Sequence, residues 1–192
     1  YTYQWQRCTS NTASSCSDVS GSTSTTYLLG QADTDKFIRA AVSYVDDYST
    51  TETVYTVFTS QIGNINDAPS AGADQTGAVT EDASTSTASG TVAGTDDDDS
   101  ASLTYTPSTT SGTYGSIAFS GAAWTYTLNN PDAETAALAA GATVSEAFTV
   151  TVTDGTASDT MTVTIGITGA NDAPSFTTTA DTSATEDTAY SY

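Results

Sequence analysis

The residues best suited to chemistry are carboxylates and amides that recur in two short motifs. Asn-Asp-Ala-Pro occurs at residues 66–69 and 171–174, and Thr-Glu-Asp follows at residues 80–82 and 185–187. A hard cation such as Ca²⁺ takes roughly six to eight oxygen ligands from carboxylates, Asn amides and backbone carbonyls, so Asp and Asn must converge on it from several loops. The motifs therefore predict Ca²⁺ sites at two joints of the chain. The alternative is a set of solvated loop charges.

Other acidic side chains are further candidates, for which coordination and plain solvation are equally open. They are Asp33, Asp35, Asp46, Asp47, Asp154 and Asp159.

The charge balance restricts the partners. The chain has 23 acidic and 3 basic residues, no His and a net charge of −20. Phosphate binding needs clustered Lys and Arg, so the sequence excludes nucleic acid and an anionic membrane surface as partners. So many negative charges repel one another in a compact state, which favours the binding of divalent metal ions that neutralise them. The alternative is that the charge only keeps the protein soluble.

Catalysis finds little support in the composition. Without His there is no familiar general base for a Ser nucleophile, and acidic pairs in loops are better explained as metal ligands or solvated turns. We therefore predict no enzymatic activity and no catalytic residues. Lys36 is the only lysine, which argues against an isopeptide staple.

Cys8 and Cys16 are the only cysteines, and they flank a polar loop. This spacing suits a disulfide across a hairpin in an oxidising compartment, with two free thiols as the alternative. The sequence contains no secretory signal or apolar membrane-spanning stretch, and it begins with Tyr1, so we expect a processed or excised segment.

Apolar and polar residues alternate in short runs, which predicts an all-β protein. Phe148–Thr153 and Met161–Ile167 read as neighbouring antiparallel strands around a turn at Asp154-Gly155, with two further strands at 122–128 and around Ile117 and Phe119. Together they suffice for the inner surface of a β-sandwich. Residues 132–140 are expected to form one short helical turn before Gly141.

The first part of the chain is read in the same way. Strands are expected at residues 1–6, with Tyr3 and Trp5 inward, at 38–44, and at 54–62. Trp5 and Trp124 could stack against sugars, but their alternation with other inward residues favours core packing.

Several runs resemble known families. Those of the second part are Gly112-Thr-Tyr-Gly-Ser-Ile117, Trp124-Thr-Tyr-Thr-Leu128, Leu138-Ala-Ala-Gly141 and Phe148-Thr-Val-Thr-Val-Thr-Asp-Gly155. Followed by Asn-Asp-Ala-Pro, they resemble the cadherin-like VCBS-type repeat of giant bacterial surface proteins. Residues 3–6, 27–29, 32–39 and 42–46 resemble the Ig-like repeats that accompany it in RTX-type adhesins. The resemblance implies tandem Greek-key β-sandwiches in an extended rod.

The resemblance also implies a domain division. Residues 1–68 would be an Ig-like sandwich lacking its opening strands, residues 69–174 the cadherin-like domain, and residues 175–192 the opening strand of another domain. The segment 175–192 could belong to a longer array, or it could complete the first domain of a neighbouring subunit by strand addition, giving a head-to-tail fibre.

By resemblance to cadherin-like modules, each joint would gather ligands from its linker and from nearby loops. At the first joint Asn66 and Asp67 would combine with Glu81, Asp82 and part of the run Asp96, Asp97, Asp98 and Asp99; at the second, Asn171 and Asp172 would pair with Glu186 and Asp187. The joints lack the longer acidic linker of animal cadherins.

The sequence thus predicts an extracellular structural module of a bacterial surface adhesin or filament, stiffened by Ca²⁺ and in contact with neighbouring repeats or identical subunits. Its settings would be cell adhesion and biofilm. The alternatives are the strand-exchanged fibre and a module that binds a glycan, ice or a protein receptor through its Thr-rich or aromatic surface. Thr on a solvent-facing strand needs no such role.

Overall fold

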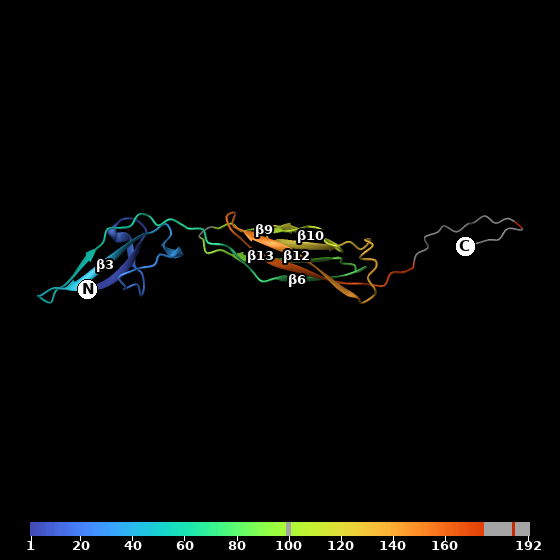
Figure 1. The fold of residues 1–192 in the computed structure, drawn as a ribbon, viewed down its shortest axis with the longest axis horizontal. Helices are drawn as coiled ribbons and strands as arrows, with labels where there is room; N and C mark the ends of the chain where they lie inside the picture. The colour runs from blue at the N-terminus through green and yellow to red at the C-terminus, as the bar shows by residue number, and fades with distance from the viewer. Residues whose placement is uncertain (99–100, 175–185, 187–192) are drawn as a thin grey trace. The chain divides into compact units, whose positions relative to one another are not determined.

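The computed structural model describes residues 1–98, 101–174 and 186, and the predicted tail strand at 175–192 lies almost wholly outside the described residues (Figure 1). The described chain is nearly all β, as its alternation predicts. Its helical elements are two 3-10 turns, η1 (Ala13–Ser15) and η2 (Gln31–Asp33).

The first strands form one four-stranded sheet in the order β2-β1-β3-β4. Its strands are β1 (Thr2–Cys8), β2 (Cys16–Asp18), β3 (Phe37–Val45) and β4 (Thr51–Tyr55). All three neighbouring pairs are antiparallel. The predicted disulfide is confirmed, because Cys8 and Cys16 lie opposite each other in the β1–β2 register and are covalently paired.

The last strand of this sheet differs from its predicted range. Residues 54–62 were expected to be extended and paired, but β4 ends at Tyr55. The reason lies in two threonines: the hydroxyls of Thr56 and Thr59 accept the N–H groups of Ala40 and Ile38, which replaces ordinary ladder pairing. Backbone N–H groups of both threonines still donate to the same two residues, so the segment follows β3 without forming a regular strand.

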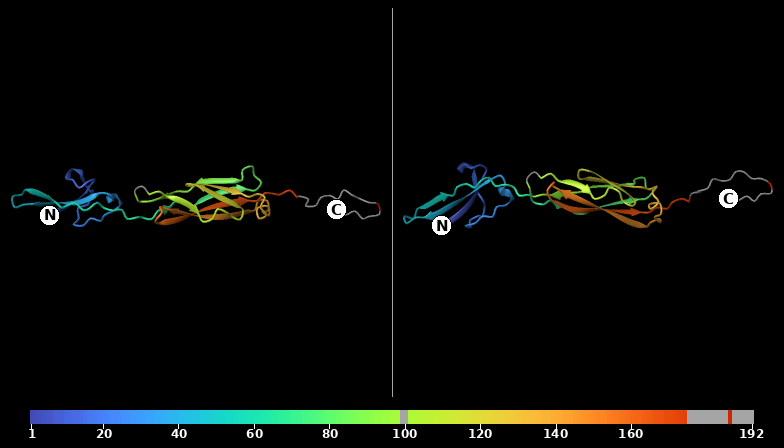
Figure 2. Two further views of the ribbon diagram at one scale, coloured as in Figure 1. Left: turned by 90° about the horizontal axis from the view of Figure 1, so that it is seen from above. Right: turned by 45° about the horizontal axis from the view of Figure 1, so that its top comes forward.

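Two further sheets form the β-sandwich, with strand orders β10-β11-β7 and β6-β13-β12-β9, and β5 pairs with β8 separately. The bounds are β5 (Ser70–Ala71), β6 (Gln75–Thr80), β7 (Thr87–Thr91), β8 (Gly94–Thr95), β9 (Thr104–Pro107), β10 (Gly115–Ser120), β11 (Ala123–Leu128), β12 (Thr143–Thr153) and β13 (Ser158–Thr168). The strands of both sheets run in roughly the same direction, which is typical of aligned sheet packing (Figure 2).

Alternate residues of these strands make the core of the sandwich. The buried side chains include Ile117, Trp124, Tyr126, Leu128, Phe148, Val150, Val152, Met161, Val163, Ile165 and Ile167. The indole ring of Trp124 occupies space that Gly77 and Gly90 leave free. A Cβ atom at Gly90 would lie 2.7 Å from Cζ2 of the ring, and a Cβ atom at Gly77 would lie 3.0 Å from Cη2. Trp124 is therefore a core residue, as its alternation predicts.

The helical turn predicted within residues 132–140 is present as a single turn and does not extend into a regular helix. The N–H groups of Ala136 and Ala137 donate to the carbonyls of Asp132 and Ala133, and Gly141 follows with a φ of 76°. Contacts divide the chain into two compact units. The first combines Tyr1–Gly72, Ala93–Thr104 and Thr151–Thr160, and the second combines Ala73–Val92, Tyr105–Val150 and the described residues of Met161–Tyr192.

Candidate metal-binding site

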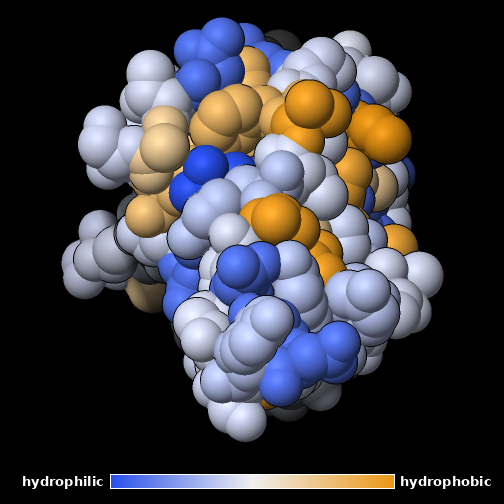
Figure 3. Space-filling model, turned by 90° about the vertical axis from the view of Figure 1, so that its left-hand side faces the viewer, coloured by the Kyte–Doolittle hydropathy of each residue, from blue (hydrophilic) through white to orange (hydrophobic). Residues whose placement is uncertain are grey.

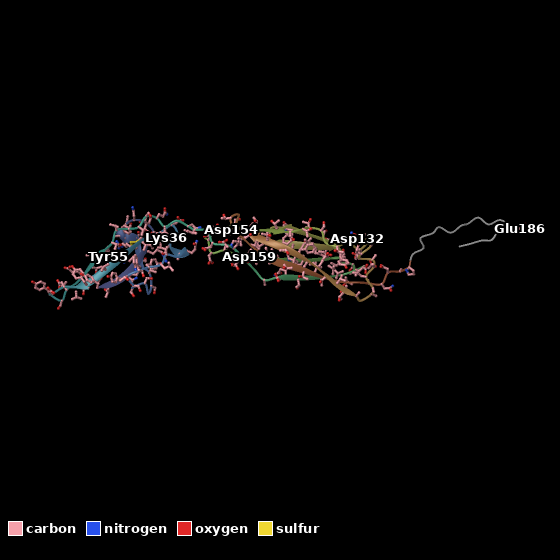
Figure 4. All side chains as sticks on the ribbon, in the orientation of Figure 1. Lys36, Tyr55, Asp132, Asp154, Asp159 and Glu186 are labelled. Atoms are coloured by element: carbon pink, nitrogen blue, oxygen red, sulfur yellow. A yellow bond between two sulfur atoms is a disulfide. The ribbon has the colours of Figure 1, made fainter. Side chains whose placement is uncertain are left out.

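Six polar residues of the first unit form what we call the linker cluster. Three follow one another closely before β5, two follow β8, and one lies in the turn between β12 and β13. They are Asn64, Asn66, Asp67, Asp96, Asp98 and Asp154. Figure 4 labels Asp154 and also Asp159, which lies near the start of β13.

Asp98 joins the linker segment to the loop after β8. Its Oδ1 accepts the side-chain amide of Asn64 at 2.8 Å, and its Oδ2 accepts the backbone N–H of Asp67 at 2.9 Å. Both carboxylate oxygens are thus engaged by the linker, which holds residues 64–67 against this loop.

Asp154 makes the second connection. Its Oδ2 accepts the side-chain amide of Asn66 at 2.9 Å, while its Oδ1 accepts the backbone N–H groups of Thr156 and Ala157 at 2.6 and 2.7 Å. The N–H groups of Ala157 and Thr156, with the Asn66 amide, hold the pKa of Asp154 below its ordinary value. Asp154 is therefore an anion at neutral pH.

Asp96 has an unsatisfied oxygen. Its Oδ1 accepts the N–H of Asp98 at 2.8 Å, but its Oδ2 is buried and has no hydrogen-bond partner among the described residues. A buried carboxylate oxygen without a partner is costly, so this atom points to a missing positive group.

The linker cluster fits a hard cation by its donor chemistry. Every side chain in it carries an oxygen that Ca²⁺ can use, and the Asp96 Oδ2 has no other partner in the described part of the chain. Three or more His, Cys, Asp or Glu side chains do not gather in a metal-holding arrangement anywhere in the described ranges. Asn64 and Asn66 instead lie beside the carboxylates and donate their amide N–H groups to them.

Glu81 lies elsewhere than expected. The resemblance assigned it to the first joint with Asn66, but its Oε2 accepts the N–H of Ala170, at the second joint, at 2.9 Å. The physical reason is the parallel pairing of β6 with β13, which puts Thr80 opposite Thr168 and carries Glu81 past the end of that ladder. Glu81 is 2% exposed, and its Oε1 has no hydrogen-bond partner in the described structure.

The remaining predicted joint ligands are not brought together in the described part of the chain. Asp82 and Asp97 are exposed, as are Asn171 and Asp172, and the Asn171 amide donates to the carbonyl of Asp172. Asp99 and Asp187 lie outside the described residues, and Glu186 is exposed.

Most of the other acidic candidates have identifiable structural partners. Asp33 is fully buried and accepts hydrogen bonds from Arg7, Tyr27 and the Gly30 N–H. In the β3–β4 turn, Asp46 accepts the N–H groups of Tyr48 and Thr50.

Asp159 accepts the N–H of Ala71 at 2.8 Å. That N–H and the N–H of Thr160 lower the pKa of Asp159. Asp35 has a φ of 60°, and Asp47 is exposed.

Sequence reasoning missed one member of the linker cluster, Asn64. The available signal was its period-two spacing from Asn66, which puts both amides on the same side of an extended segment.

In the described residues, no helix is long and apolar enough to cross a membrane.

Comparison with solved structures gives distant likenesses. Mouse protocadherin-24 EC1-3 is 22% identical with a TM-score of 0.38, over 69% of this chain and 45% of that one. Mouse cadherin-23 EC22-24 is 13% identical with a TM-score of 0.48, over 87% and 53%. An endo-fucoidan hydrolase from glycoside hydrolase family 107 is 17% identical with a TM-score of 0.36, over 70% and 18%.

The chain thus spans about half the length of the two cadherin structures. No curated protein matches the sequence.

The sequence match to a family is more extensive. The family described as bacterial cadherin-like domain matches residues 66–169, more than half of the chain. Cadherin-like domains are typically non-enzymatic extracellular modules of adhesion or structure, and they generally bind Ca²⁺. With its matching β-sandwich strands, this chain belongs to the bacterial cadherin-like domain family.

Proposed function

We propose that this protein is a non-enzymatic structural module of a bacterial surface adhesin or filament, in which Ca²⁺ bound at the linker cluster stiffens a tandem array. The observation that carries the proposal is the buried Oδ2 atom of Asp96, which has no hydrogen-bond partner among the described residues. Two more carboxylates, those of Asp97 and Asp98, follow Asp96 directly in the sequence. A cation is the group that would satisfy this oxygen and reduce the repulsion of the adjacent carboxylates.

The amides of Asn64 and Asn66 can serve the cluster in two ways. In the structure they donate N–H groups to Asp98 and Asp154. A half-turn of an amide exchanges its nitrogen for its oxygen, so the same residues become acceptors. Asp96, Asp98, Asp154 and the two amides would then hold the ion. Because these three carboxylates do not converge in the described structure, the ion would have to draw them together as it binds.

Stiffening follows from where these residues lie in the sequence. Residues 64–67 are held by Asp98 and Asp154, whose loops are separated from them by more than 30 and 80 residues along the chain. A linker fixed at two points has less freedom than one fixed by its backbone alone. Interfaces between small domains are otherwise slight enough to permit relative motion.

Glu81 supports a second site of the same kind near Ala170. Its buried Oε1 is the corresponding unsatisfied oxygen, and Asn171 and Asp172 follow Ala170 directly. We therefore assign Glu81 to the second joint in this proposal.

Calorimetric titration of the full chain with Ca²⁺ tests the proposal. We expect a dissociation constant for Ca²⁺ of about 10⁻⁴ to 10⁻³ M, as for weak sites in extracellular modules. Asp96→Asn and Asp98→Asn should each weaken the first site at least about tenfold, because each removes a charge from the ligand set. Asp47→Asn removes the same charge from an exposed position outside the cluster and should leave binding unchanged. Equal effects of all three variants would refute a specific site.

A further inference from the structure

Two parallel strands that lie side by side begin and end the sandwich. β6 comes first in the sequence of its two sheets and pairs with β13, the last strand of the described residues (Figure 1). The register runs from Gln75 opposite Val163 to Thr80 opposite Thr168. Because the strands are parallel, the chain enters this ladder at one end, before Gln75, and leaves it at the other, after Thr168. Tension along the chain therefore pulls β6 and β13 past each other lengthwise.

A lengthwise pull acts on every pair of this ladder at once. If the first and last strands were antiparallel neighbours, both chain ends would leave from the same end of the ladder, and tension would open its pairs one by one. In β6 and β13 the six pairs resist together, so the bonds between the strands must break together. Forced unfolding is governed by the unfolding rate, and this arrangement raises the barrier that sets the rate.

Two acidic side chains extend the ladder beyond its ends. Before it, Oδ1 of Asp74 accepts the backbone N–H of Thr162 at 2.7 Å. After it, the backbone N–H of Glu81 donates to the carbonyl of Thr168 at 2.9 Å, and Oε2 of Glu81 accepts the N–H of Ala170 at 2.9 Å. Both carboxylates receive N–H groups from the β13 segment. The two segments are thus bonded over a longer stretch than the regular pairs alone.

The core prevents β6 from sliding to a new register under tension. Side chains alternate between the faces of a strand, so the smallest slide that keeps Val79 on the buried face is two residues. Tension would carry Val79 to the place of Gly77. A Cβ atom there would lie 2.9 Å from Cδ1 of Ile165 and 3.0 Å from Cη2 of Trp124, so a valine does not fit. The same slide would carry the Glu81 carboxylate into the apolar position that Val79 leaves.

We propose that β6, β13 and the contacts of Asp74 and Glu81, here called the force clamp, make the sandwich an element that resists extension of the chain. The clamp consists of contacts within the protein, so it acts without Ca²⁺ and goes beyond the proposed function. Under tension the sandwich stays folded until the clamp ruptures. It then opens in one step, because separation of β6 from β13 exposes the core beside buried Val79 and Ile165.

The first region differs from the sandwich in its packing. All three neighbouring pairs of its sheet are antiparallel, and the large exposed hydrophobic side chains of the described residues all lie between Tyr1 and Ile65. Figure 3 views the side that carries the N-terminus and shows exposed hydrophobic atoms among hydrophilic ones. A sheet that buries less of its apolar surface has fewer contacts to break, so we expect it to unfold at a lower force than the sandwich.

Single-molecule force spectroscopy of the full chain, held at its two ends in buffer with chelator, tests the proposal. Unfolding of the sandwich releases roughly 100 residues and should lengthen the chain by roughly 300 Å. The first sheet spans fewer residues, and the Cys8–Cys16 disulfide keeps its loop closed, so its event should be about half as long. The longer event should require the higher force. A sandwich that opens below the force of the first sheet would contradict the clamp, whether or not Ca²⁺ binds.

Two valine truncations separate the clamp from general stability. Val79→Ala removes two methyl groups from β6, and Val150→Ala removes the same groups from β12, outside the clamp; the two valines are 5% and 0% exposed. Urea unfolding first establishes that each variant folds. At a fixed force, Val79→Ala should raise the unfolding rate of the sandwich at least about tenfold and Val150→Ala less than about threefold, because this rate responds to contacts that break before the barrier. Equal increases would overturn the proposal.

A conservative pair of variants tests the bond that precedes the ladder. Asp74→Ala removes the acceptor of the Thr162 N–H, whereas Asp74→Asn keeps an oxygen that can accept it. Asp74 is exposed, so both variants should fold. Asp74→Ala should raise the unfolding rate under force roughly fivefold, and Asp74→Asn should stay within about twofold of the native rate. A native rate in Asp74→Ala would contradict the assignment of this residue to the clamp.

Discussion

The two regions of this chain reach a stable fold by different means. The cadherin-like region buries alternate residues of its strands, whereas the first 65 residues form one sheet that leaves Tyr1, Tyr48 and Val57 about nine-tenths exposed, at 87%, 90% and 88%. The first region compensates with directed contacts. They include the Cys8–Cys16 disulfide and the ion pair of Arg7 with buried Asp33 at 2.7 Å. Where a core is small, individual links carry more of the stability.

The largest expected difference concerns the two tryptophans. Trp124→Ala should lower the free energy of unfolding by about 3–5 kcal/mol, because Trp124 is 2% exposed and its removal leaves a cavity between Gly77 and Gly90. Trp5 is half-buried and stacks on Tyr27, with ring centres 5.7 Å apart, so Trp5→Ala should cost less. Urea unfolding followed by circular dichroism would compare the free energies of unfolding of the two variants. Equal losses would mean that the first sheet has an equivalent core.

The next effect concerns Asp33. Asp33→Asn breaks a charged contact at a fully buried carboxylate and should destabilise the first region by about 2–4 kcal/mol near neutral pH. Hydrogen–deuterium exchange, which resolves the two regions, should show the loss in the first sheet and not in the sandwich. An equal loss of protection in the sandwich would show that the two regions depend on each other.

The same carboxylate predicts an acid dependence. Burial alone would raise the pKa of Asp33, but hydrogen bonds from Gly30, Arg7 and Tyr27 outweigh it and hold the pKa below its ordinary value. A depressed folded-state pKa contributes stability above the unfolded value of about 3.9, and this contribution is lost as pH falls toward the folded value. Urea midpoints of the native chain should therefore fall more steeply than those of Asp33→Asn between about pH 5 and 3. Parallel curves would show that Asp33 titrates normally.

Reduction of the disulfide should have a smaller effect on the same region. Cys8 and Cys16 are 8 residues apart, so the bond closes a short loop, and its loss should cost about 2–3 kcal/mol. After reduction, hydrogen–deuterium exchange of the backbone amides should become faster in β1, β2 and β3, while the amides of β11 and β13 should remain protected from exchange. The double variant Cys8→Ser with Cys16→Ser controls for effects of the reductant.

The smallest predicted effect lies in the sandwich. The Tyr126 hydroxyl donates to Glu146, and burial with that carboxylate raises the pKa of Tyr126. Glu146 keeps the N–H groups of Thr113 and Tyr114, at 2.7 and 3.2 Å, when the hydroxyl is removed. Tyr126→Phe should thus cost only about 1–2 kcal/mol in thermal or urea unfolding. A loss as large as that of Trp124→Ala would make this network, and not the apolar core, the main support of the sandwich.

Local patterns and long-range pairing differ in what the sequence can predict. The alternation from Phe148 to Ile167 correctly predicts β12, β13 and their buried faces, because period-two patterning is a local property. The position of Glu81 depends on a parallel pairing between residues 75–80 and 163–168, far apart in sequence. No local motif specifies that pairing, and the resemblance that groups Glu81 with Asn66 and Asp67 does not reveal it.

The linker cluster shows the same limit. Its residue types were recognisable in the Asn-Asp-Ala-Pro and Asp-rich runs, since these are oxygen donors. The contact between Asn66 and Asp154 spans 88 residues and emerges only when the turn after β12 meets the linker. The strand expected at 54–62 was wrong for a local reason, because threonine hydroxyls at 56 and 59 replace ladder bonds.

Small-angle X-ray scattering with and without Ca²⁺ tests the proposed stiffening most directly. Millimolar Ca²⁺ should saturate sites of the expected strength. The account predicts that Ca²⁺ narrows the distribution of interdomain distances, that chelator reverses the change, and that Asp98→Asn abolishes it while Asp47→Asn does not. Identical scattering in Ca²⁺ and in chelator would contradict a calcium-stiffened module.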